Sequence, residues 1–350
     1  MKKINLLIAK LGNPIKRLEK YLLDLGWIEP NYAEQKKKEL FKPIENIIHP
    51  VRTKLIRKEL KASQLIGKTQ DGKHIYLFDY MPNSSVMREI GRLRELSFRQ
   101  VQEGTGNALD IDSYDRYYRH LILWDEDELE IIGSYRIGEA AKILKEHGEA
   151  GLYTHSLFEF DSAFKPYLEH AIELGRSFIQ PRYQGKRSLD YLWYGIGAYL
   201  YQHPEIRYMV GPVSLSTSLP ESAQKVIAAF YTELFGKDEL LAKPRLPFEF
   251  ERVEDFAPFR KVAGEVEYKQ AYTILKEKMD EFGVKVPVLY KQYVELCQPG
   301  GCEFLGFNID PTFSNCVDAL ILVHIDTIKE KKNQRYIESH AMVMQSLNSA

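Results

Sequence analysis

The sequence has few cysteines, no long apolar run and almost no net charge. Its three cysteines in 350 residues, Cys297, Cys302 and Cys316, cannot all pair with one another, which argues against a disulfide scaffold and for a reducing compartment. No His or Cys pair follows "CQPGGC" at ligand spacing, so no metal site is predicted. No stretch approaches the roughly 18 apolar residues that a membrane-spanning helix needs. A net charge of −1 gives no global attraction to nucleic acid, and we expect a cytoplasmic globular protein.

The small net charge hides an uneven distribution. Residues 1–70 contain 16 Lys and Arg against 7 Asp and Glu, a surplus of +9, so residues 71–350 carry −10. A basic segment on an acidic body indicates an anionic partner, either the lipid of a membrane surface or an acidic protein. The alternative is a solvated helical face packed on the acidic body. The apolar stretch in "MKKINLLIAKLGNP" is too short for an export signal.

Apolar spacing predicts a mixed α/β chain. Helical spacing of Leu and Ile marks residues 1–65, and residues 84–102 repeat it behind a serine start. A Gly- and Asp-rich loop follows over 104–119. Strands are predicted at 73–81, at 120–125 and 130–138 as a hairpin, and at 168–180, 207–216 and 318–326. Further helices are predicted at 187–201 and 218–236, the second with Ser218 and Glu221 spaced as a capping box, and a Pro-punctuated linker at 242–259.

The segment "PRYQGKRSL", residues 181–189, joins a predicted strand directly to a predicted helix. Backbone N–H groups at such a turn, with Arg and Lys beside them, suit phosphate oxygens. Gly185 would let the backbone approach the ligand closely. The turn is therefore a candidate phosphate site, and the alternative is a helix-opening turn that is merely basic.

The order of helix, Asp-rich loop, hairpin, long strand, "RYQGKRS" turn, helix and strand resembles the GNAT N-acyltransferase fold. Within that fold the sequence resembles the branch of acyl-homoserine-lactone synthases and N-acyl amino acid synthases. The likeness is greatest to bacterial ornithine- and glycine-lipid synthases, sometimes labelled haemolysin-like, and it covers about residues 85–330. It implies an α/β fold with a mixed, mostly antiparallel sheet flanked by helices. The implied regions are a basic, mainly helical segment 1–80, a GNAT-like core 81–240 and an α/β extension 241–350 that completes the acyl and amine site.

The resemblance assigns a substrate-binding group. Arg94 in "RELSF" matches the arginine of the branch's first helix, and Asp112 and Asp115 in "DIDSYD" match its Asp-x-x-Asp pair. Arg136 in "GSYRI" matches the arginine of a following strand. Two carboxylates can grip an amino group, and two arginines a substrate carboxylate. Equally, the four can form a structural network that locks the loop to the sheet.

The resemblance also assigns catalytic residues, because Glu173 and Arg176 in "ELGR" match the Glu-x-x-Arg of the branch's central strand. An amine must be neutral to attack a thioester, and α-amino groups titrate near pH 8, so a base is useful. Glu173 is the predicted base, with Arg176 near it. A spacing of three points the two side chains to opposite faces unless a bulge intervenes, and in GNAT proteins this strand does bulge and splay to receive pantetheine. The alternative is a buried ion pair that braces the sheet.

At the turn, "RYQGKRS" stands where GNAT proteins carry a Gln/Arg-x-x-Gly-x-Gly/Ala loop for pyrophosphate or phosphopantetheine. Here Lys186 and Arg187 replace the second small residue, which favours a carrier-bound phosphopantetheine over coenzyme A. The implied donor-binding residues are Arg182, Gln184, Gly185, Lys186 and Arg187.

The sequence thus predicts a cytoplasmic N-acyltransferase, in peripheral contact with the inner face of the membrane. It would move a long acyl chain from acyl carrier protein, or from acyl-CoA, to the α-amine of an amino acid such as glycine or ornithine, for aminolipid synthesis. The acyl thioester is a co-substrate, and neither a bound cofactor nor a nucleic-acid partner is expected. Two alternatives stay open, a synthase of an N-acyl signal molecule and a non-catalytic acyl-binding or membrane-active protein.

Overall fold

The computed structural model describes residues 44–259 and 264–340. The chain divides into two compact units, Met1–Asn46 and Ile47–Ala350. Nearly all of the first unit, including most of the basic segment and the helices predicted there, lies outside the described residues. Within the described ranges, every helix is too short or too polar to cross a membrane.

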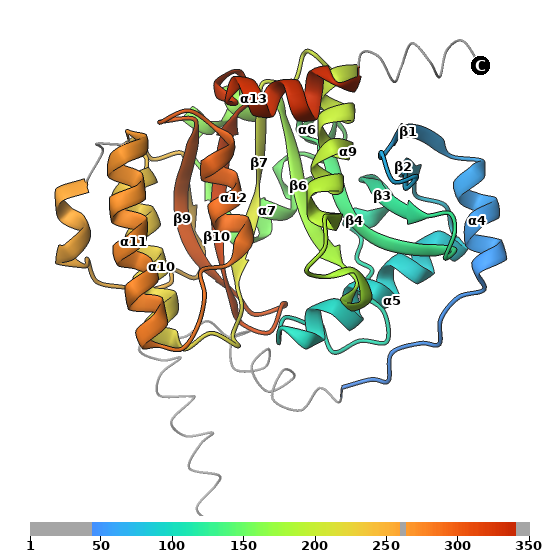
Figure 1. The fold of residues 1–350 in the computed structure, drawn as a ribbon, viewed down its shortest axis with the longest axis horizontal. Helices are drawn as coiled ribbons and strands as arrows, with labels where there is room; N and C mark the ends of the chain where they lie inside the picture. The colour runs from blue at the N-terminus through green and yellow to red at the C-terminus, as the bar shows by residue number, and fades with distance from the viewer. Residues whose placement is uncertain (1–43, 260–263, 341–350) are drawn as a thin grey trace, which may run out of the picture. The chain divides into compact units, whose positions relative to one another are not determined.

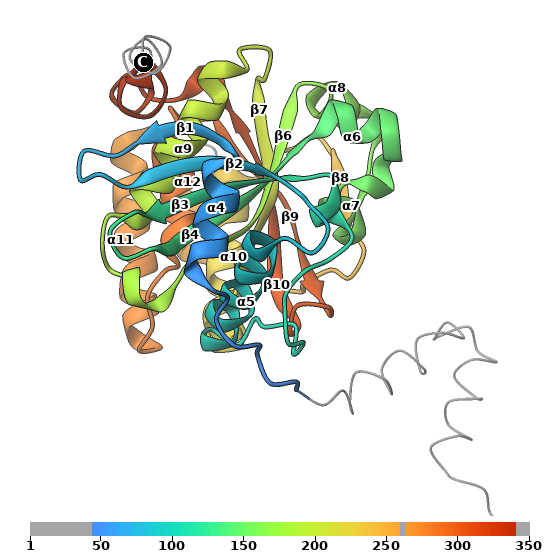
Figure 2. The same cartoon turned by 90° about the vertical axis from the view of Figure 1, so that its right-hand side faces the viewer.

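One eight-stranded sheet organises the second unit (Figures 1 and 2). Its order is β1-β2-β3-β4-β6-β7-β10-β9, and every neighbouring pair is antiparallel except the parallel pair β6 and β7. The strands are β1 Gln64–Lys68, β2 His74–Asp79, β3 Arg119–Asp125, β4 Glu130–Glu139, β6 Ala171–Ile179, β7 Tyr208–Leu215, β9 Cys302–Asp310 and β10 Cys316–His324. A small second sheet pairs β5 Phe158–Phe160 with β8 Ala242–Pro244.

Alternating apolar side chains cover both faces of the large sheet. In β3, Leu121 and Leu123 pack in one cluster with helices α9 to α12, and Ile122 and Trp124, which point to the other face, pack with helices α4 and α5. A third cluster joins α6 to α8 with the even-numbered Leu320 and Leu322 of β10. The helices are α4 Thr53–Lys61, α5 Ser85–Gln100, α6 Ala140–His147, α7 Tyr153–Leu157, α8 Lys165–Leu168, α9 Ser188–Gln202, α10 Glu221–Phe235, α11 Glu265–Glu281, α12 Val288–Leu296 and α13 Glu330–Asn333.

The predicted hairpin, the central strand, the helix after the "RYQGKRS" turn and the following strand are all present as β3–β4, β6, α9 and β7. The mixed, mostly antiparallel sheet flanked by helices is confirmed. The predicted capping box is wrong. α10 begins at Glu221 with Pro220 at its N-cap, and no side chain in the described part of the chain caps it. Ser218 lies outside the helix and pairs with the hydroxyl of Ser216 at 2.8 Å instead.

The sheet crosses the boundaries of all three predicted regions. β1 and β2 come from the segment predicted as 1–80, and β9 and β10 come from 241–350. β10 pairs with β7 along eight successive residue pairs, from Val317–Leu215 to His324–Tyr208. The segment 241–350 therefore extends the sheet beyond β7, with β10 directly beside β7 and β9 at the edge.

Candidate active site

The strands β6 and β7 form a fork. They pair only from Ala171–Glu173 to Tyr208–Val210 and diverge beyond. At the point of divergence a Cβ on Gly211 would collide with the carbonyl oxygen of Leu174, so glycine permits the close approach. Pro212 follows at once, and a proline inside a strand is tolerated where one edge is free. The fork leaves an open stretch of both strands inside the sheet.

A β-bulge lies in β6 at the fork. Ser134 pairs with Phe178 and Arg136 with Gly175, so β6 holds one residue more than β4 over this interval. Arg176 takes a left-handed conformation, with φ 49°. Beyond the bulge the pattern reverses, because Leu174 packs in the cluster with α9 to α12 and Phe178 packs with α5. The bulge and the splay implied by the resemblance are therefore present.

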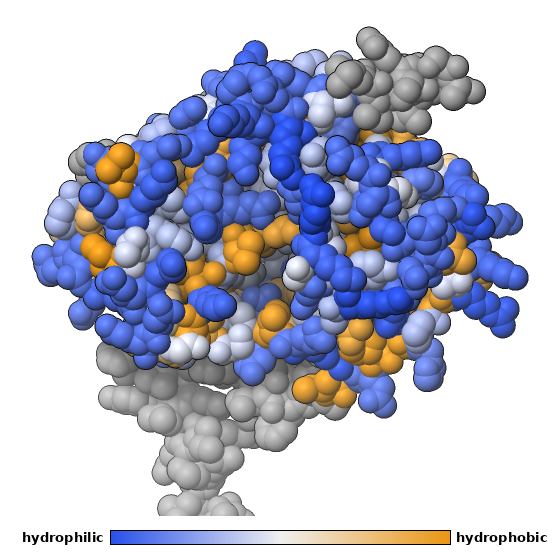
Figure 3. Space-filling view, in the orientation of Figure 1, coloured by the Kyte–Doolittle hydropathy of each residue, from blue (hydrophilic) through white to orange (hydrophobic). Residues whose placement is uncertain are grey.

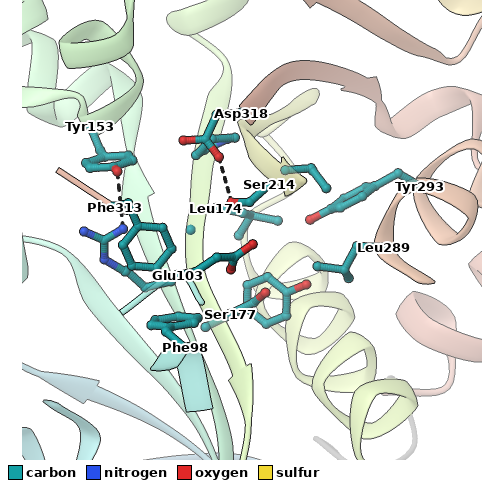
Figure 4. A pocket seen from close by; sticks show the side chains of 15 residues that line it. Phe98, Glu103, Tyr153, Leu174, Ser177, Ser214, Leu289, Tyr293, Phe313 and Asp318 are labelled. Atoms are coloured by element: carbon teal, nitrogen blue, oxygen red, sulfur yellow. Dashed lines mark hydrogen bonds between the residues drawn. The ribbon is translucent and has the colours of Figure 1, made fainter. Parts of the chain in front are cut away.

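A cavity of about 110 Å³ occupies the fork (Figure 4). The molecular face drawn in Figure 3 is hollowed near its centre, and apolar side chains gather around the hollow. The cavity is lined by Phe98, Glu103, Tyr135, Tyr153, Leu174, Gly175, Arg176, Ser177, Pro212, Val213, Ser214, Leu289, Tyr293, Phe313 and Asp318. Among the described residues that line this cavity, Arg176 is the one that was predicted as a site residue.

The predicted substrate-binding group comes together as a largely buried network, in which Asp112 alone of the four is partly exposed. Arg94 Nη1 lies 2.8 Å from Asp115 Oδ1, and Arg136 Nη1 lies 2.6 Å from Asp112 Oδ1 and 3.4 Å from Asp115 Oδ1. Burial opposes the ionisation of both carboxyls. Even so, Arg136 holds the pKa of Asp112 below its usual value, and Arg94 and Arg136 hold the pKa of Asp115 well below its own. Since none of the four belongs to the described cavity lining, their direct contact with substrate stays a prediction.

Arg176 connects this network to the cavity. Its Nε lies 3.3 Å from Asp110 Oδ2, its Nη2 lies 3.5 Å from Asp112 Oδ2, and its Nη1 donates to the hydroxyl of Tyr153 at 3.3 Å. The guanidinium also stacks 4.8 Å from the ring centre of Tyr153 and 4.6 Å from that of Phe313. The cation is thus fixed on the cavity wall, and an anionic group of a ligand can meet it there.

Glu173 is placed differently from Arg176. Its carboxylate accepts hydrogen bonds from the backbone N–H groups of Tyr153, at 3.0 Å, and Thr154, at 2.6 Å, and from the hydroxyl of Tyr118. Burial and the adjacent carboxylate raise the pKa of Tyr118, so its phenol remains a donor. These bonds satisfy free N–H groups in the first turn of α7. Glu173 is 1% exposed and lies outside the described cavity lining, so a role as base stays a prediction.

Two cavity carboxylates were missed from the sequence, Glu103 and Asp318. Burial raises the pKa of Glu103 to about 8, with the charge of Asp318 adding to the effect and Arg176 opposing it. Burial also raises the pKa of Asp318 to about 7, with Asp310 adding. A lone acid opening the apolar strand "DALILVHID" was the available signal for Asp318. Groups that hold protons near neutral pH in a cavity are candidates for proton transfer.

The predicted donor-binding residues form an exposed turn between β6 and α9. Arg182 pairs with Glu128 at 2.6 Å and Glu130 at 2.8 Å, and the Gln184 side-chain amide donates to the carbonyl of Ile179 at 3.2 Å. Gly185 has φ 72° and open space where a side chain would start. The charges of Lys186 and Arg187 lie 5.0 Å and 5.5 Å from the ring centres of Tyr183 and Tyr191. Phosphate binding at this turn stays a prediction.

Comparisons with known proteins find a GNAT family match and several N-acyltransferases. The family described as Acetyltransferase (GNAT) domain matches residues 93–194. A glycine N(alpha)-acyltransferase of Phocaeicola vulgatus is 33% identical over 85% of this chain and 94% of its own length, and one of Bacteroides thetaiotaomicron is 34% identical over 85% and 92%. An L-ornithine N(alpha)-acyltransferase of Agrobacterium fabrum is 27% identical over 46% of this chain and 56% of its own. Among solved structures, the CoA-dependent acyl-homoserine lactone synthase MesI aligns over 76% of this chain and 95% of its own, with 11% identity and a TM-score of 0.33.

The fold and the family match define an acyl-transferring enzyme of the GNAT class. The chain belongs to the amino-acid N-acyltransferase family that the two glycine N(alpha)-acyltransferases represent. The prediction of an enzyme, rather than a non-catalytic acyl-binding protein, is confirmed.

Proposed function

We propose that the protein transfers a long acyl group from a carrier-bound thioester to the α-amine of glycine, as a step of aminolipid synthesis. The observation that carries this proposal is the cavity in the fork, where the cation of Arg176 and the carboxyls of Glu103 and Asp318 share one small space. Glycine offers the complementary pair of charges, a carboxylate and an ammonium, on a molecule without a side chain. The names of the two glycine N(alpha)-acyltransferases, each of which matches 85% of this chain, support the same acceptor.

The size of the cavity favours glycine over ornithine. A volume of about 110 Å³ suits an acceptor of few atoms, whereas ornithine adds three methylenes and a second ammonium. In the proposed complex, Arg176 pairs with the acceptor carboxylate, the interaction for which a guanidinium is well shaped. The acceptor nitrogen then lies on the side of Glu103 and Asp318.

The donor would enter along the open edge of the fork. An extended pantetheine can pair with an exposed strand edge, and a backbone N–H beyond the bulge can polarise the thioester carbonyl. The apolar rim in Figure 3 offers a path for the acyl chain. Acyl carrier protein is acidic, and the exposed Lys186 and Arg187 on the turn after β6 provide complementary charge. We also propose that the protein contacts the inner face of the membrane peripherally.

The function is tested with full-length protein and a mixture of acceptors. The protein is incubated with palmitoyl-acyl carrier protein or with palmitoyl-CoA, in the presence of equimolar common amino acids and ornithine, and the products are identified by mass spectrometry. We expect N-palmitoylglycine as the main product and faster formation from the carrier protein. N-palmitoylornithine as the main product would show that ornithine, and not glycine, is the preferred acceptor. The absence of any N-acyl product with either donor would overturn the proposed function.

A second expected outcome concerns the turn. Replacing Lys186 and Arg187 together by alanine should raise the KM for the carrier-bound donor several-fold at low salt, with less effect at 0.3 M salt, because exposed charges are screened. The KM for glycine should stay unchanged. Gly185→Asn should raise the donor KM as well, since asparagine tolerates a positive φ while adding bulk beside the backbone.

The matched control replaces two exposed lysines of α6, Lys142 and Lys145, by alanine. This control keeps the change of charge but leaves the turn intact, so its donor KM should equal that of the wild type. Equal changes in the KM values of donor and glycine would show that the turn does not bind the donor phosphate.

A further inference from the structure

Glu103 is a buried carboxylate to which the described residues offer no hydrogen-bond or ion-pair partner. Its residue is 9% exposed, its side chain lines the cavity, and among the described residues no hydrogen bond or ion pair to its carboxyl oxygens is found. Figure 4 shows the carboxyl among the cavity-lining side chains, with Phe98 and Tyr293 also in view. Buried ionisable groups are ordinarily paired, since desolvation without a partner is costly. An unpaired carboxyl that faces a cavity indicates a ligand with a hydrogen-bond donor or a positive charge.

The backbone around Glu103 is held in place from two sides. Its own N–H donates to the carbonyl of Phe98 at 2.8 Å, at the end of α5. Ser216 and Thr217, directly after β7, donate to the carbonyls of Val101 and Gln102, the second at 2.9 Å. From the β9–β10 turn, Ser314 donates to the carbonyl of Gly104 at 2.7 Å. Residues 101–104 are therefore held by hydrogen bonds from both sides, and this fixed backbone orients the Glu103 side chain.

Asp318 is the second carboxyl of the cavity, and it does have partners. Ser214 donates to Asp318 Oδ1 at 2.7 Å, and the Cys316 thiol lies 3.8 Å from the same atom. Asp318 is thus oriented from β7 and from its own strand, while Glu103 remains available to a ligand.

Groups on three elements act on Glu103 electrostatically. They are Asp318 and Cys316 on β10, Arg176 on β6 and Tyr290 on α12, and the hydroxyls of Tyr135, Tyr153 and Tyr293 complete the polar wall. Two carboxyls in one buried site resist ionising together, so near neutral pH the pair tends to retain a proton. An ammonium group beside them favours the doubly ionised pair.

We propose that Glu103 is the general base that accepts a proton from the α-amine of the acceptor, and that Asp318 helps to hold the ammonium group beside it. This inference rests on the proposed function. It differs from the assignment of Glu173, whose oxygens are occupied by Tyr118, Tyr153 and Thr154.

The proton and electron balance of the step is complete. The acceptor ammonium gives one proton to the Glu103 carboxylate, and the freed nitrogen lone pair forms the C–N bond at the thioester carbonyl carbon. The C–S bond breaks with its electron pair on sulfur. The nitrogen loses a second proton, which converts the thiolate to the thiol, and the proton on Glu103 passes to water. The products are the amide, the thiol of the carrier and one released proton.

The test compares Glu103→Gln and Asp318→Asn with the wild type in the N-palmitoylglycine assay from pH 6 to 9.5. At pH 7, Glu103→Gln should lower kcat/KM for glycine by roughly 10²–10⁴ and leave the donor KM unchanged. Its deficit should stay nearly constant from pH 7 to 8, where both rates rise, and should shrink above pH 8, where the wild-type rate has levelled off. The amine of free glycine titrates higher than a peptide α-amine, so its neutral fraction still grows there. The wild type, which has its own base, should show a rise with pH that levels off near pH 8.

Asp318→Asn provides a signature that loss of structure cannot produce. Because the charge of Asp318 raises the pKa of Glu103, its removal should shift the rising limb of the pH profile to lower pH and raise the KM for glycine. Glu89→Gln is the matched control, a buried carboxyl of α5 that pairs with Arg92 and the N–H of Val51 and should keep the wild-type profile per folded molecule.

The outcomes separate the two proposals. A wild type that makes no N-acylglycine would remove the function and the base together. A wild type that makes it, alongside a folded Glu103→Gln variant with an unchanged rate and pH profile, would overturn the base assignment alone. If Glu103→Gln does not fold, the Asp318→Asn variant decides. A pH profile whose rising limb coincides with that of the wild type would then overturn the base assignment.

Discussion

Replacing Glu173 by glutamine should lower the free energy of unfolding by on the order of 3 kcal/mol, and the folded variant should retain the pH profile of the wild type. The carboxylate accepts two backbone N–H groups and one phenol, and it is buried. Glutamine keeps a single acceptor oxygen and turns an NH₂ group toward one of the donors. Urea unfolding measures the loss, and kinetics of the remaining folded enzyme measure the profile.

Tyr118→Phe is the control for this change. It removes one donor to Glu173 and leaves the two backbone bonds, so its cost should be nearer 1 kcal/mol. If Glu173→Gln instead unfolds like the wild type while kcat falls by roughly 10²–10⁴ and the rising limb disappears, Glu173 is the base that the resemblance implied.

The same contacts explain how Glu173 can matter for activity without touching substrate. By accepting from the first N–H groups of α7, it fixes Tyr153. Tyr153 in turn accepts from Arg176 at 3.3 Å, donates to Asp310 at 2.6 Å and lines the cavity. A shift of Tyr153 would therefore reach both the proposed carboxylate site at Arg176 and the acidic side at Asp318. We therefore expect Glu173 to act by positioning Tyr153, and its loss to raise the KM for glycine.

Much of the sheet could be predicted from the sequence, because period-two patterns and turn residues mark β3, β4, β6 and β7 directly. β1 was missed because it spans only Gln64–Lys68 and follows a helical pattern. β9 was missed because its pairing with β10 shifts near Gly306, which interrupts the alternation of its buried residues. Local patterning describes strands that run undisturbed and fails where a bulge resets the phase.

The candidate site was likewise predicted only in part. Arg94, Asp112, Asp115 and Arg136 were grouped correctly, since the resemblance placed them on adjoining elements, but which of them would reach a ligand was not decided by sequence. The direction of Arg176 depends on the bulge in β6. The meeting of Glu103 and Asp318 depends on β10 lying next to β7, a pairing between distant segments that no local spacing encodes. The acidic side of the cavity, formed by Glu103 and Asp318, could therefore be predicted only from the tertiary topology.

That acidic side should make the wild-type protein less stable as the pH rises from about 5 to 8. Burial raises the folded-state pKa of Glu103 to about 8 and that of Asp318 to about 7, whereas in the unfolded chain both titrate near 4. Below pH 4 both states are protonated and the two groups cost nothing. As the pH rises, the unfolded chain releases protons that the folded protein still binds, so the free energy of unfolding falls until the folded-state pKa is passed. Asp112 and Asp115, whose pKa values are lowered, act in a separate window, because their stabilisation is present above pH 4 and is lost as the pH falls below it.

Combining Glu103→Gln with Asp318→Asn should therefore stabilise the protein at pH 8 by about 2–4 kcal/mol, since each pKa unit corresponds to about 1.4 kcal/mol and the two groups are coupled. Urea unfolding at pH 5, 6.5 and 8 measures both the gain and the flattening of the slope. Glu89→Gln, which breaks a buried ion pair, should lose stability at all three values. A double variant that is less stable than the wild type at pH 8 would show that the two carboxyls support the fold. A variant that gains stability while losing turnover would show that the fold tolerates their burial for the sake of the proton transfer that we assign to them.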